Sequence, residues 1–318
     1  MALRVLVTGA NGFVGLPLCA RLARSGIEVI AGVRRASAAL TALGAQGRLR
    51  QAEFGDLGVA ADWSSALAGV DAVVHLAARV HVLGTAADPA LFHRINVEGT
   101  FALAEAAARA GVQRFVFMST VKAMDARGDP YSQSKAEAEQ RLREAAGRFG
   151  LACVIVRSPL VYGPRVRANF LRLMRLVDTG IPLPLASVSN RRSLVFVGNL
   201  ADGLHACVTE PDATGRSFAI SDGEDISTPD LVRRIAHALG RPARLFPFPV
   251  AMLRVAGAVT GQSQAIDRLI GDLTIDSSPI RSVLRWRPPF SMAQGLAETA
   301  AWYLAHREQR PRRGGNNT

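Results

Sequence analysis

The feature that most constrains the fold is a run near the N-terminus in which Gly9, Gly12 and Gly15 stand three residues apart. Residues 4–7 before them are mostly apolar and β-branched, which predicts a buried strand. An apolar pattern at helical spacing follows and predicts a helix. In such a strand–turn–helix unit the first glycine permits a tight turn, the second lets the backbone approach a diphosphate, and the third lets the helix pack on the strand. The run therefore predicts a dinucleotide-binding loop, with an ordinary structural turn as the alternative.

The length and composition of the chain set the class of protein. Its 318 residues suit one large α/β domain or two smaller ones. The segment 246–260 comes closest to a membrane span, but it is short and contains Arg254. We see no export signal, and Cys19, Cys153 and Cys207 each lie in an apolar setting, which favours buried thiols over disulfides or a metal site. We therefore expect a cytoplasmic protein without a membrane segment.

The net charge of +12 raises the question of an anionic partner. The arginines are spread along the chain and few aromatic residues interleave with them, so the pattern does not indicate a nucleic-acid surface. Residues 307–318 are predicted to form a flexible basic tail. Since Lys122 and Lys135 are the only lysines, a compositional bias toward arginine accounts for most of the charge.

The end of the second predicted strand, 27–31, bears on which dinucleotide binds. In dinucleotide folds an acid near this point bonds the adenosine ribose and selects NAD. Here the chain reads Arg34 and Arg35 with no acid, and a guanidinium matches the 2′-phosphate of NADP. We predict NADP, with NAD left open because both arginines could simply be exposed.

Further strand patterns continue the series. Asp56 and Leu57 follow a third short strand, and a fourth, from residue 71, runs through His75 into small residues that would let a ligand approach the backbone. We expect His75 to be a core histidine rather than a catalytic one, since no triad pattern surrounds it. Residues 88–110 form a long helical pattern, and 115–118 a fifth strand that ends before Thr120.

A candidate acid/base pair opens the next predicted helix. Tyr131 and Lys135 are four residues apart and so share a helix face. A nearby ammonium stabilises a phenolate, which would lower the pKa of Tyr131 and let it move protons near neutral pH. A surface contact is the alternative, but the pair lies one loop after Thr120 in a chain that already predicts a dinucleotide fold.

Five segments together resemble one family. They are 8–15, 75–78, 96–100, the Tyr131–Lys135 pair, and 157–164, which reads RSPLVYGP. As a set they are similar to the extended short-chain dehydrogenase/reductases, and more closely to their nucleotide-sugar epimerase/dehydratase branch, which includes UDP-glucose 4-epimerase-like enzymes and 4-keto-sugar-nucleotide reductases. The resemblance extends from about residue 3 to about residue 302. It implies an α/β fold with a doubly wound parallel sheet and a smaller C-terminal lobe for the substrate.

The resemblance implies a role for each matching position. Tyr131 would be the general acid/base, Lys135 would hold the nicotinamide ribose and tune Tyr131, and Thr120 would bond the reacting oxygen. The residues implied on the cofactor side are Gly9, Gly12, Phe13, Val14, Gly15, Arg34, Asp56, Leu57, Leu76, Ala77, Ala78, Asn96, Tyr131, Lys135 and Pro159. Lys122, Asn169, Arg192 and Arg268 would contact the substrate, and Arg192 would pair with the nucleotide diphosphate.

The same resemblance suggests the domain organisation. Residues 1–164 would form the dinucleotide-binding domain, with 195–210 returning to it, and 165–306 mainly the substrate lobe. Within the returning stretch, residues 195–207 would rejoin the main sheet. The family also suggests a homodimer formed through the helices around 99–110 and 135–149. Two departures stand out: the stretch from Thr120 to Tyr131 is shorter than is usual in the family, and Leu160 replaces a polar substrate contact.

We therefore expect an NAD(P)-dependent enzyme acting on a nucleotide-linked sugar. The first expectation is reduction of a 4-keto-6-deoxy sugar nucleotide by NADPH, and the alternative is an NAD-dependent UDP-sugar 4-epimerase. A dehydratase is less favoured because Ser119 and Val121, not acidic residues, flank Thr120. A catalytically idle NADP sensor is the alternative of another class, and the shortened loop supports it a little.

Overall fold

The computed structural model describes residues 2–45, 47–57, 62–80, 88–125 and 129–307. Contacts divide the chain into two compact units. The first comprises residues 1–159, 198–221 and 275–289, and the second comprises 160–197, 222–274 and 290–318. Within the described ranges no helix has the length and apolar character needed to cross a membrane.

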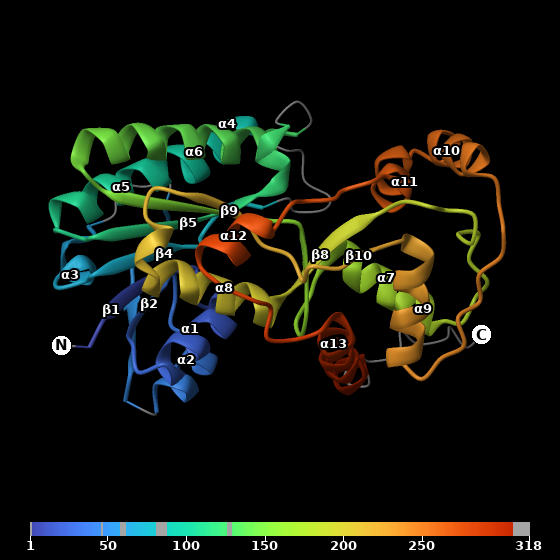
Figure 1. The fold of residues 1–318 in the computed structure, drawn as a ribbon, viewed down its shortest axis with the longest axis horizontal. Coiled ribbons are helices and arrows are strands. Elements are labelled where there is room, and N and C mark those ends of the chain that lie inside the picture. The colour runs from blue at the N-terminus through green and yellow to red at the C-terminus, as the bar shows by residue number, and fades with distance from the viewer. Residues whose placement is uncertain (1, 46, 58–61, 81–87, 126–128, 308–318) are drawn as a thin grey trace, which may run out of the picture. The chain divides into compact units, whose positions relative to one another are not determined.

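The first unit is built on a seven-stranded sheet in the order β3-β2-β1-β4-β5-β6-β9 (Figure 1), and every pair of neighbours in it is parallel. The strands are β1 (Arg4–Thr8), β2 (Glu28–Val33), β3 (Leu49–Glu53), β4 (Ala72–His75), β5 (Arg114–Thr120), β6 (Ala152–Ser158) and β9 (Ser217–Ala219). Since the strand order reverses at β1, the carboxyl ends of β1 and β4 border the crevice in which such sheets bind ligands. The predicted doubly wound parallel sheet is confirmed.

Helices cover both faces of this sheet, with α5 and α6 on one face and α1, α2 and α8 on the other (Figure 1). The helical elements of this unit are α1 (Gly15–Arg24), α2 (Ala38–Gly44), α3 (Ser64–Leu67), α4 (Pro89–Phe92), the π-helix η1 (His93–Glu98), α5 (Gly99–Arg109), the 3₁₀ turn η2 (Val121–Met124), α6 (Pro130–Phe149), α8 (Val197–Thr209), the 3₁₀ turn η3 (Pro211–Ala213) and α12 (Ser278–Val283). The Nε atom of Arg21 in α1 donates to Asp202 in α8 at 2.6 Å, which ties two helices of one face together.

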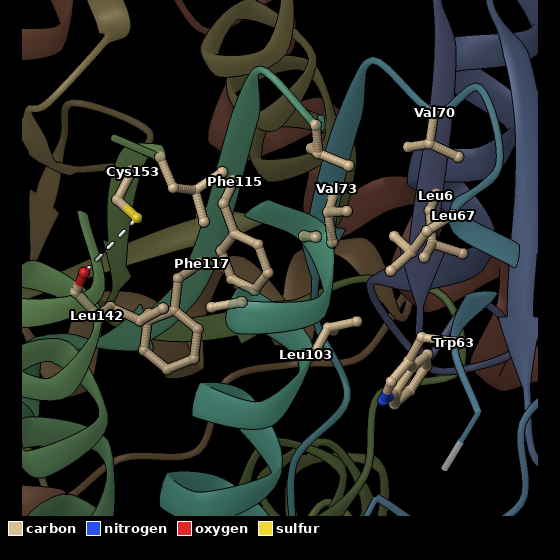
Figure 2. Close-up of a cluster of buried hydrophobic side chains, with 14 of the residues drawn as sticks. Leu6, Trp63, Leu67, Val70, Val73, Leu103, Phe115, Phe117, Leu142 and Cys153 are labelled. Atoms are coloured by element: carbon tan, nitrogen blue, oxygen red, sulfur yellow. Dashed lines mark hydrogen bonds between the residues drawn. The ribbon is translucent and has the colours of Figure 1, made fainter. Parts of the chain in front are cut away.

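The core of this unit lies between the sheet and the α5–α6 face. Figure 2 shows Leu6, Val73 and Phe115 from three strands packed with Leu103 of α5 and Leu142 of α6. The thiol of Cys153 belongs to this cluster and lies 3.7 Å from the Leu142 carbonyl oxygen. Cys19 and Cys207 are buried too, and none of the three thiols is in a disulfide, so the prediction of buried apolar cysteines is confirmed.

Helix α6 shows how local sequence sets an element that carries the site. Asp129 is its N-cap, accepting from the Ser132 amide at 3.0 Å, and Pro130 occupies its first turn. The helix ends at Gly150, whose φ of 66° suits a residue without a Cβ. These signals fix the helix start one residue before Tyr131.

The second unit contains a three-stranded sheet in the order β10-β8-β7, with β7–β8 parallel and β8–β10 antiparallel. Its elements are β7 (Leu160–Tyr162), α7 (Ala168–Asp178), β8 (Arg192–Phe196), β10 (Asp225–Ile226), α9 (Thr228–Ala238), α10 (Val250–Val259), α11 (Ser263–Ile270) and α13 (Met292–Arg307). Asp178 at the end of α7 accepts from Arg241, Tyr303 and Arg307, which joins α7 to α13 and to the segment after α9.

The predicted organisation differs in three details, since residues 160–164 and 195–197 group with the second unit and 275–289 with the first. Residues 195–207 were expected to return to the large sheet, but Val195 and Phe196 pair with β7 in the small sheet. In the large sheet the edge of β6 is paired with β9. The chain leaves that sheet after Pro159 and forms β7, and β8 pairs in parallel with β7. Residues 198–221, which contain most of α8 and all of β9, group with the first unit.

Candidate active site

The glycine turn has the geometry that its spacing predicts. Gly9 has a φ of 67°, and its carbonyl oxygen accepts from the Gly12 amide at 2.9 Å, which closes a tight turn. A Cβ on Gly9 would lie 3.0 Å from the backbone nitrogen of Ala77, and one on Gly15 would overlap the backbone of Gly9 and Ala10. The first and third glycines therefore serve the turn and the packing of α1 on β1, as predicted.

The start of α1 fits an anion. Its N-cap, Val14, provides no side-chain hydrogen bond, and its first turn contains no acidic residue. Amide groups at a helix N-terminus that no side chain caps are suited to binding phosphate, and the helix dipole adds to this. The residues present thus fit the diphosphate of a dinucleotide, with Gly12, Phe13 and Val14 only half-buried in the turn.

Gly15 offers a direct test of this turn. Gly15→Ala is expected to weaken NAD(H) binding about tenfold or more and to destabilise the protein by about 1–3 kcal/mol, since the added methyl group has no space against the Gly9 carbonyl. Fluorescence titration of NADH and urea unfolding measure the two effects. The matched control is Gly147→Ala in α6, where a Cβ would meet nothing within 4 Å, and this variant is expected to gain about 0.5–1 kcal/mol. Unchanged affinity and stability in Gly15→Ala would contradict this account of the turn.

The segment after β4 is held by a buried hydrogen-bond relay through His75. Thr8 Oγ1 lies 2.7 Å from His75 Nδ1 and accepts from the Ala77 amide at 3.3 Å, while His75 Nε2 lies 3.0 Å from Thr100 Oγ1. Thr100 Oγ1 donates to the Asn96 carbonyl at 2.7 Å, which assigns the ring proton to Nε2. Burial and the charge of Lys135 lower the pKa of His75 to about 3, so the ring is neutral. His75 is a satisfied core histidine, as predicted.

Asn96 fixes the same segment from the other side. Its Oδ1 accepts from the Arg79 amide at 2.7 Å, and its Nδ2 lies 3.0 Å from the Arg79 carbonyl and 2.9 Å from Ser134 Oγ. Ser134 Oγ in turn donates to the Tyr131 carbonyl at 2.8 Å. Asn96, expected as a cofactor contact, is buried, and its amide joins the backbone of Arg79, directly after the Leu76–Ala78 segment, to Ser134 of α6.

Thr120, Tyr131 and Lys135 lie in one unit, on the end of β5 and the first two turns of α6. Thr120 is buried and its Oγ1 accepts from the Lys122 amide at 3.3 Å, which leaves the hydroxyl proton for a further acceptor. Tyr131 is half-buried and its ring meets Phe92 edge-on at 6.4 Å. The Lys135 ammonium is buried over the Phe117 ring, 3.8 Å from its centroid.

The electrostatics of this pair differ from the expectation. Burial, with a contribution from Asp129, raises the pKa of Tyr131 to about 12 rather than lowering it. Burial lowers the pKa of Lys135 to about 7, against the opposing effect of Glu139. The reason is that taking the phenolate and the ammonium out of water costs each of them its charged form. At neutral pH the structure therefore holds Tyr131 as a proton donor beside a lysine that is only partly charged.

The remaining predicted cofactor residues lie at the ends of other strands. Arg34 and Asp56 are exposed, just after β2 and β3, and Pro159 is buried directly after β6. Leu57 packs against the core. Their contacts with a cofactor stay predictions.

The predicted substrate residues fall in both units. In the second unit, the Arg192 guanidinium donates to the carbonyls of Arg268 at 2.6 Å and Gly271 at 2.8 Å, so β8 and the end of α11 are joined and the two predicted arginines are neighbours. Asn169 is exposed at the start of α7. In the first unit, Lys122 Nζ lies 3.9 Å from Asp129 Oδ2.

Sequence reasoning missed the buried groups behind the pair, above all Glu139 and its partners. The signal was present, since Glu139 stands eight residues after Tyr131 and four after Lys135, on the same face of the helix. The ring of Phe117, on which Lys135 rests, had no signal beyond its strand pattern.

Comparisons with known proteins agree with this geometry. Residues 5–221 match the model described as the NAD dependent epimerase/dehydratase family. A UDP-glucose 4-epimerase of Vibrio cholerae is 38% identical, over 94% of this chain and 95% of that protein. A dTDP-glucose 4,6-dehydratase of Streptomyces griseus is 31% identical, over 96% of each chain.

Solved structures agree as well. The structure of MoeE5 in complex with UDP-glucose and NAD is 26% identical and superposes with a TM-score of 0.74, covering 96% of this chain and 100% of that one. The structure of a double mutant of DesIV, a dTDP-glucose 4,6-dehydratase of Streptomyces venezuelae with NAD bound, is 28% identical with a TM-score of 0.76 over 96% and 98%. By its sequence, its parallel sheet and its Tyr–Lys pair, the chain belongs to the NAD-dependent epimerase/dehydratase family of the extended short-chain dehydrogenases/reductases.

Proposed function

We propose that this enzyme reduces a 4-keto-6-deoxy sugar nucleotide with NADPH. The observation that carries the choice of a dissociable phosphorylated cofactor is the end of β2, where exposed Arg34 and Arg35 stand in place of an acid. A guanidinium pairs with a 2′-phosphate through two hydrogen bonds, and an acid there would repel it.

The chain's own groups suit this reaction. NADPH would supply the hydride, and Tyr131 would give its proton to the keto oxygen. Its high pKa keeps the proton on the phenol until the oxygen gains negative charge. Thr120 would donate a hydrogen bond to the same oxygen, while Lys135 would hold the nicotinamide ribose. Gly9, Gly12 and Gly15 would hold the diphosphate of the cofactor.

The substrate end of the proposal rests on the second unit. The Arg192 guanidinium donates to the backbone carbonyl of Arg268, so the two residues are neighbours, and arginine side chains suit the diphosphate of a nucleotide sugar. In the first unit, Lys122 stands two residues after Thr120, next to Asp129.

The absence of an acidic pair beside Thr120 in the sequence disfavours a dehydratase, which must eliminate water. We also propose that α5 and α6 form the interface of a homodimer.

A UDP-sugar 4-epimerase is the second candidate, favoured by the 38% identity to the Vibrio cholerae protein over nearly the whole of both chains. It would use the same proton and hydride groups in both directions, with a retained NAD.

One set of assays separates the two. A reductase is expected to consume added NADPH when given UDP-4-keto-6-deoxyglucose, with much slower consumption of NADH, and to leave UDP-glucose unchanged. An epimerase is expected to convert UDP-glucose to UDP-galactose without added nucleotide, and to retain NAD through purification, which mass spectrometry of the released cofactor would identify. Retained NAD with no consumption of NADPH would overturn the reductase proposal.

A further inference from the structure

Helix α6 is bonded to the sheet through a buried carboxylate, Glu139. Its Oε1 accepts from Ser119 Oγ at 2.6 Å and from Arg157 Nε at 2.9 Å, and its Oε2 accepts from Arg157 Nη2 and, at 3.0 Å, from Arg143 Nη2. Only 3% of the side chain is exposed. Ser119 belongs to β5 and Arg157 to β6, so one carboxylate connects the helix with two neighbouring strands.

The two ends of this connection are next to the reacting groups. Ser119 immediately precedes Thr120, and Glu139 lies one turn beyond Lys135 and two turns beyond Tyr131 on the same helix face. The hydroxyl of Thr120 and the phenol of Tyr131 come from different elements, and both must meet one substrate oxygen. We propose that Glu139 is a positioning residue that holds α6, with Tyr131 and Lys135, in place against Thr120 at the end of β5. This inference rests on the proposed function, and it identifies the contact that holds Tyr131 and Lys135 in position relative to Thr120.

The number of donors shows why a carboxylate is needed at this place. Four hydrogen bonds from three side chains use both oxygens of Glu139, and the pair with Arg157 is bidentate. A buried charge is tolerated only when hydrogen-bonded partners of opposite charge surround it. The position of the Glu139 carboxylate is therefore strongly constrained. An amide at position 139 would keep the shape but would face Arg157 with a donor, and the cluster would have to move.

Glu139 also acts on Lys135 through its charge. Burial lowers the pKa of Lys135, and Glu139 is the group that raises it. Of the other titratable groups nearby, Tyr131 lies one turn earlier on the same helix, and His75 of β4, whose pKa the charge of Lys135 helps to lower, is neutral at working pH. Arg157 and Arg143 face Glu139 and offset part of its charge. Without Glu139, Lys135 would lose its proton at a lower pH.

The test compares three variants in turnover and in NADH binding. Glu139→Gln removes both functions of the carboxylate. It is expected to lower kcat about 10–100-fold with the KM for the sugar nucleotide nearly unchanged, because misplaced reacting groups cost rate rather than binding of the sugar. The basic limb of its kcat–pH profile moves to lower pH. Ser119→Ala removes only the bond to β5 and is expected to lower kcat about tenfold without moving that limb. Glu28→Gln is the control, since Glu28 also pairs with an arginine of a neighbouring strand, but at the amino end of the sheet.

NADH affinity gives a readout that needs no turnover. Glu139→Gln is expected to bind NADH about tenfold more weakly than wild type at about pH 8 and within about twofold of wild type at about pH 6, where much of Lys135 is protonated in both proteins. The proposal would be overturned if Glu139→Gln had the kcat, the pH profile and the NADH affinity of the wild type. An unchanged kcat in Ser119→Ala would also overturn it. If Glu139→Gln does not fold, Ser119→Ala alone is the test. If the wild type turns over neither substrate, the proposed function fails, while the pH dependence of NADH binding still tests the role of Glu139.

Discussion

Tyr131→Phe is expected to lower kcat for the reduced or epimerised sugar nucleotide by about 10²–10⁴-fold, the usual contribution of a positioned general acid/base. The substitution keeps the ring and its edge contact with Phe92, so the loss reports the missing proton alone. Affinity for NADH is expected to stay within about threefold of wild type, since binding relies on the glycine turn and Lys135. Steady-state turnover and fluorescence titration measure the two quantities.

The control for this variant is Tyr303→Phe. The Tyr303 hydroxyl donates to Asp178 Oδ2 at 3.1 Å, in the second unit on α13. Its removal is expected to change kcat less than about twofold. A Tyr131→Phe enzyme with more than a tenth of wild-type kcat would show that another group carries the proton. If the wild-type protein turned over no sugar nucleotide and Tyr131→Phe behaved like the wild type in cells, the alternative function as a non-catalytic NADP sensor would be favoured.

Much of the fold followed from local signals. The β-branched runs of buried parallel strands are distinctive, and the capping pair of Asp129 and Pro130 located the start of α6. The turn at Gly9 was predictable because its φ of 67° favours a residue without a Cβ, and because a Cβ on Gly12 or Gly15 would crowd the Gly9 carbonyl oxygen.

What the sequence did not reveal depends on contacts between distant segments. Residues 88–110 were predicted as one helix, but the stretch His93–Glu98 is a π-helix, where Asn96 bonds the backbone of Arg79 and the side chain of Ser134. A pattern of apolar residues carries no information on that partner. Val195 and Phe196 were placed in the wrong sheet for a similar reason, because strand pairing is a choice among distant partners.

The acid/base pair shows the same limit in electrostatics. The spacing of Tyr131 and Lys135 was sufficient to identify the pair, but the sign of the Tyr131 pKa shift depends on burial. In the folded chain burial raises the pKa of Tyr131, with a further contribution from Asp129, and burial lowers the pKa of Lys135 against the opposing charge of Glu139. A residue's solvent exposure is set by the whole fold, so it could not be read from a five-residue motif.

The burial of Lys135 leads to the second large prediction, a variant that gains stability while losing activity. Lys135→Met is expected to lower kcat about 10²-fold or more, since it removes the charge beside Tyr131. The same change is expected to stabilise the cofactor-free protein at about pH 7 by on the order of a few kcal/mol. Methionine is of similar length and can occupy the place over the Phe117 ring without a charge to bury. Glu139 keeps Arg157, Arg143 and Ser119 as partners.

The pH dependence of this gain identifies its cause. The pKa of Lys135 falls from 10.5 in its ordinary state to about 7 in the folded protein. Between these values the unfolded chain binds one more proton than the folded chain, so wild-type stability rises with pH across that window. The advantage of Lys135→Met must therefore shrink between about pH 7 and about pH 10, which urea unfolding at several pH values would follow. Lys122→Met replaces the other lysine, which is half-exposed, and is expected to show no such trend. If the advantage of Lys135→Met were the same at every pH, the gain would come from packing rather than from relief of a buried ammonium.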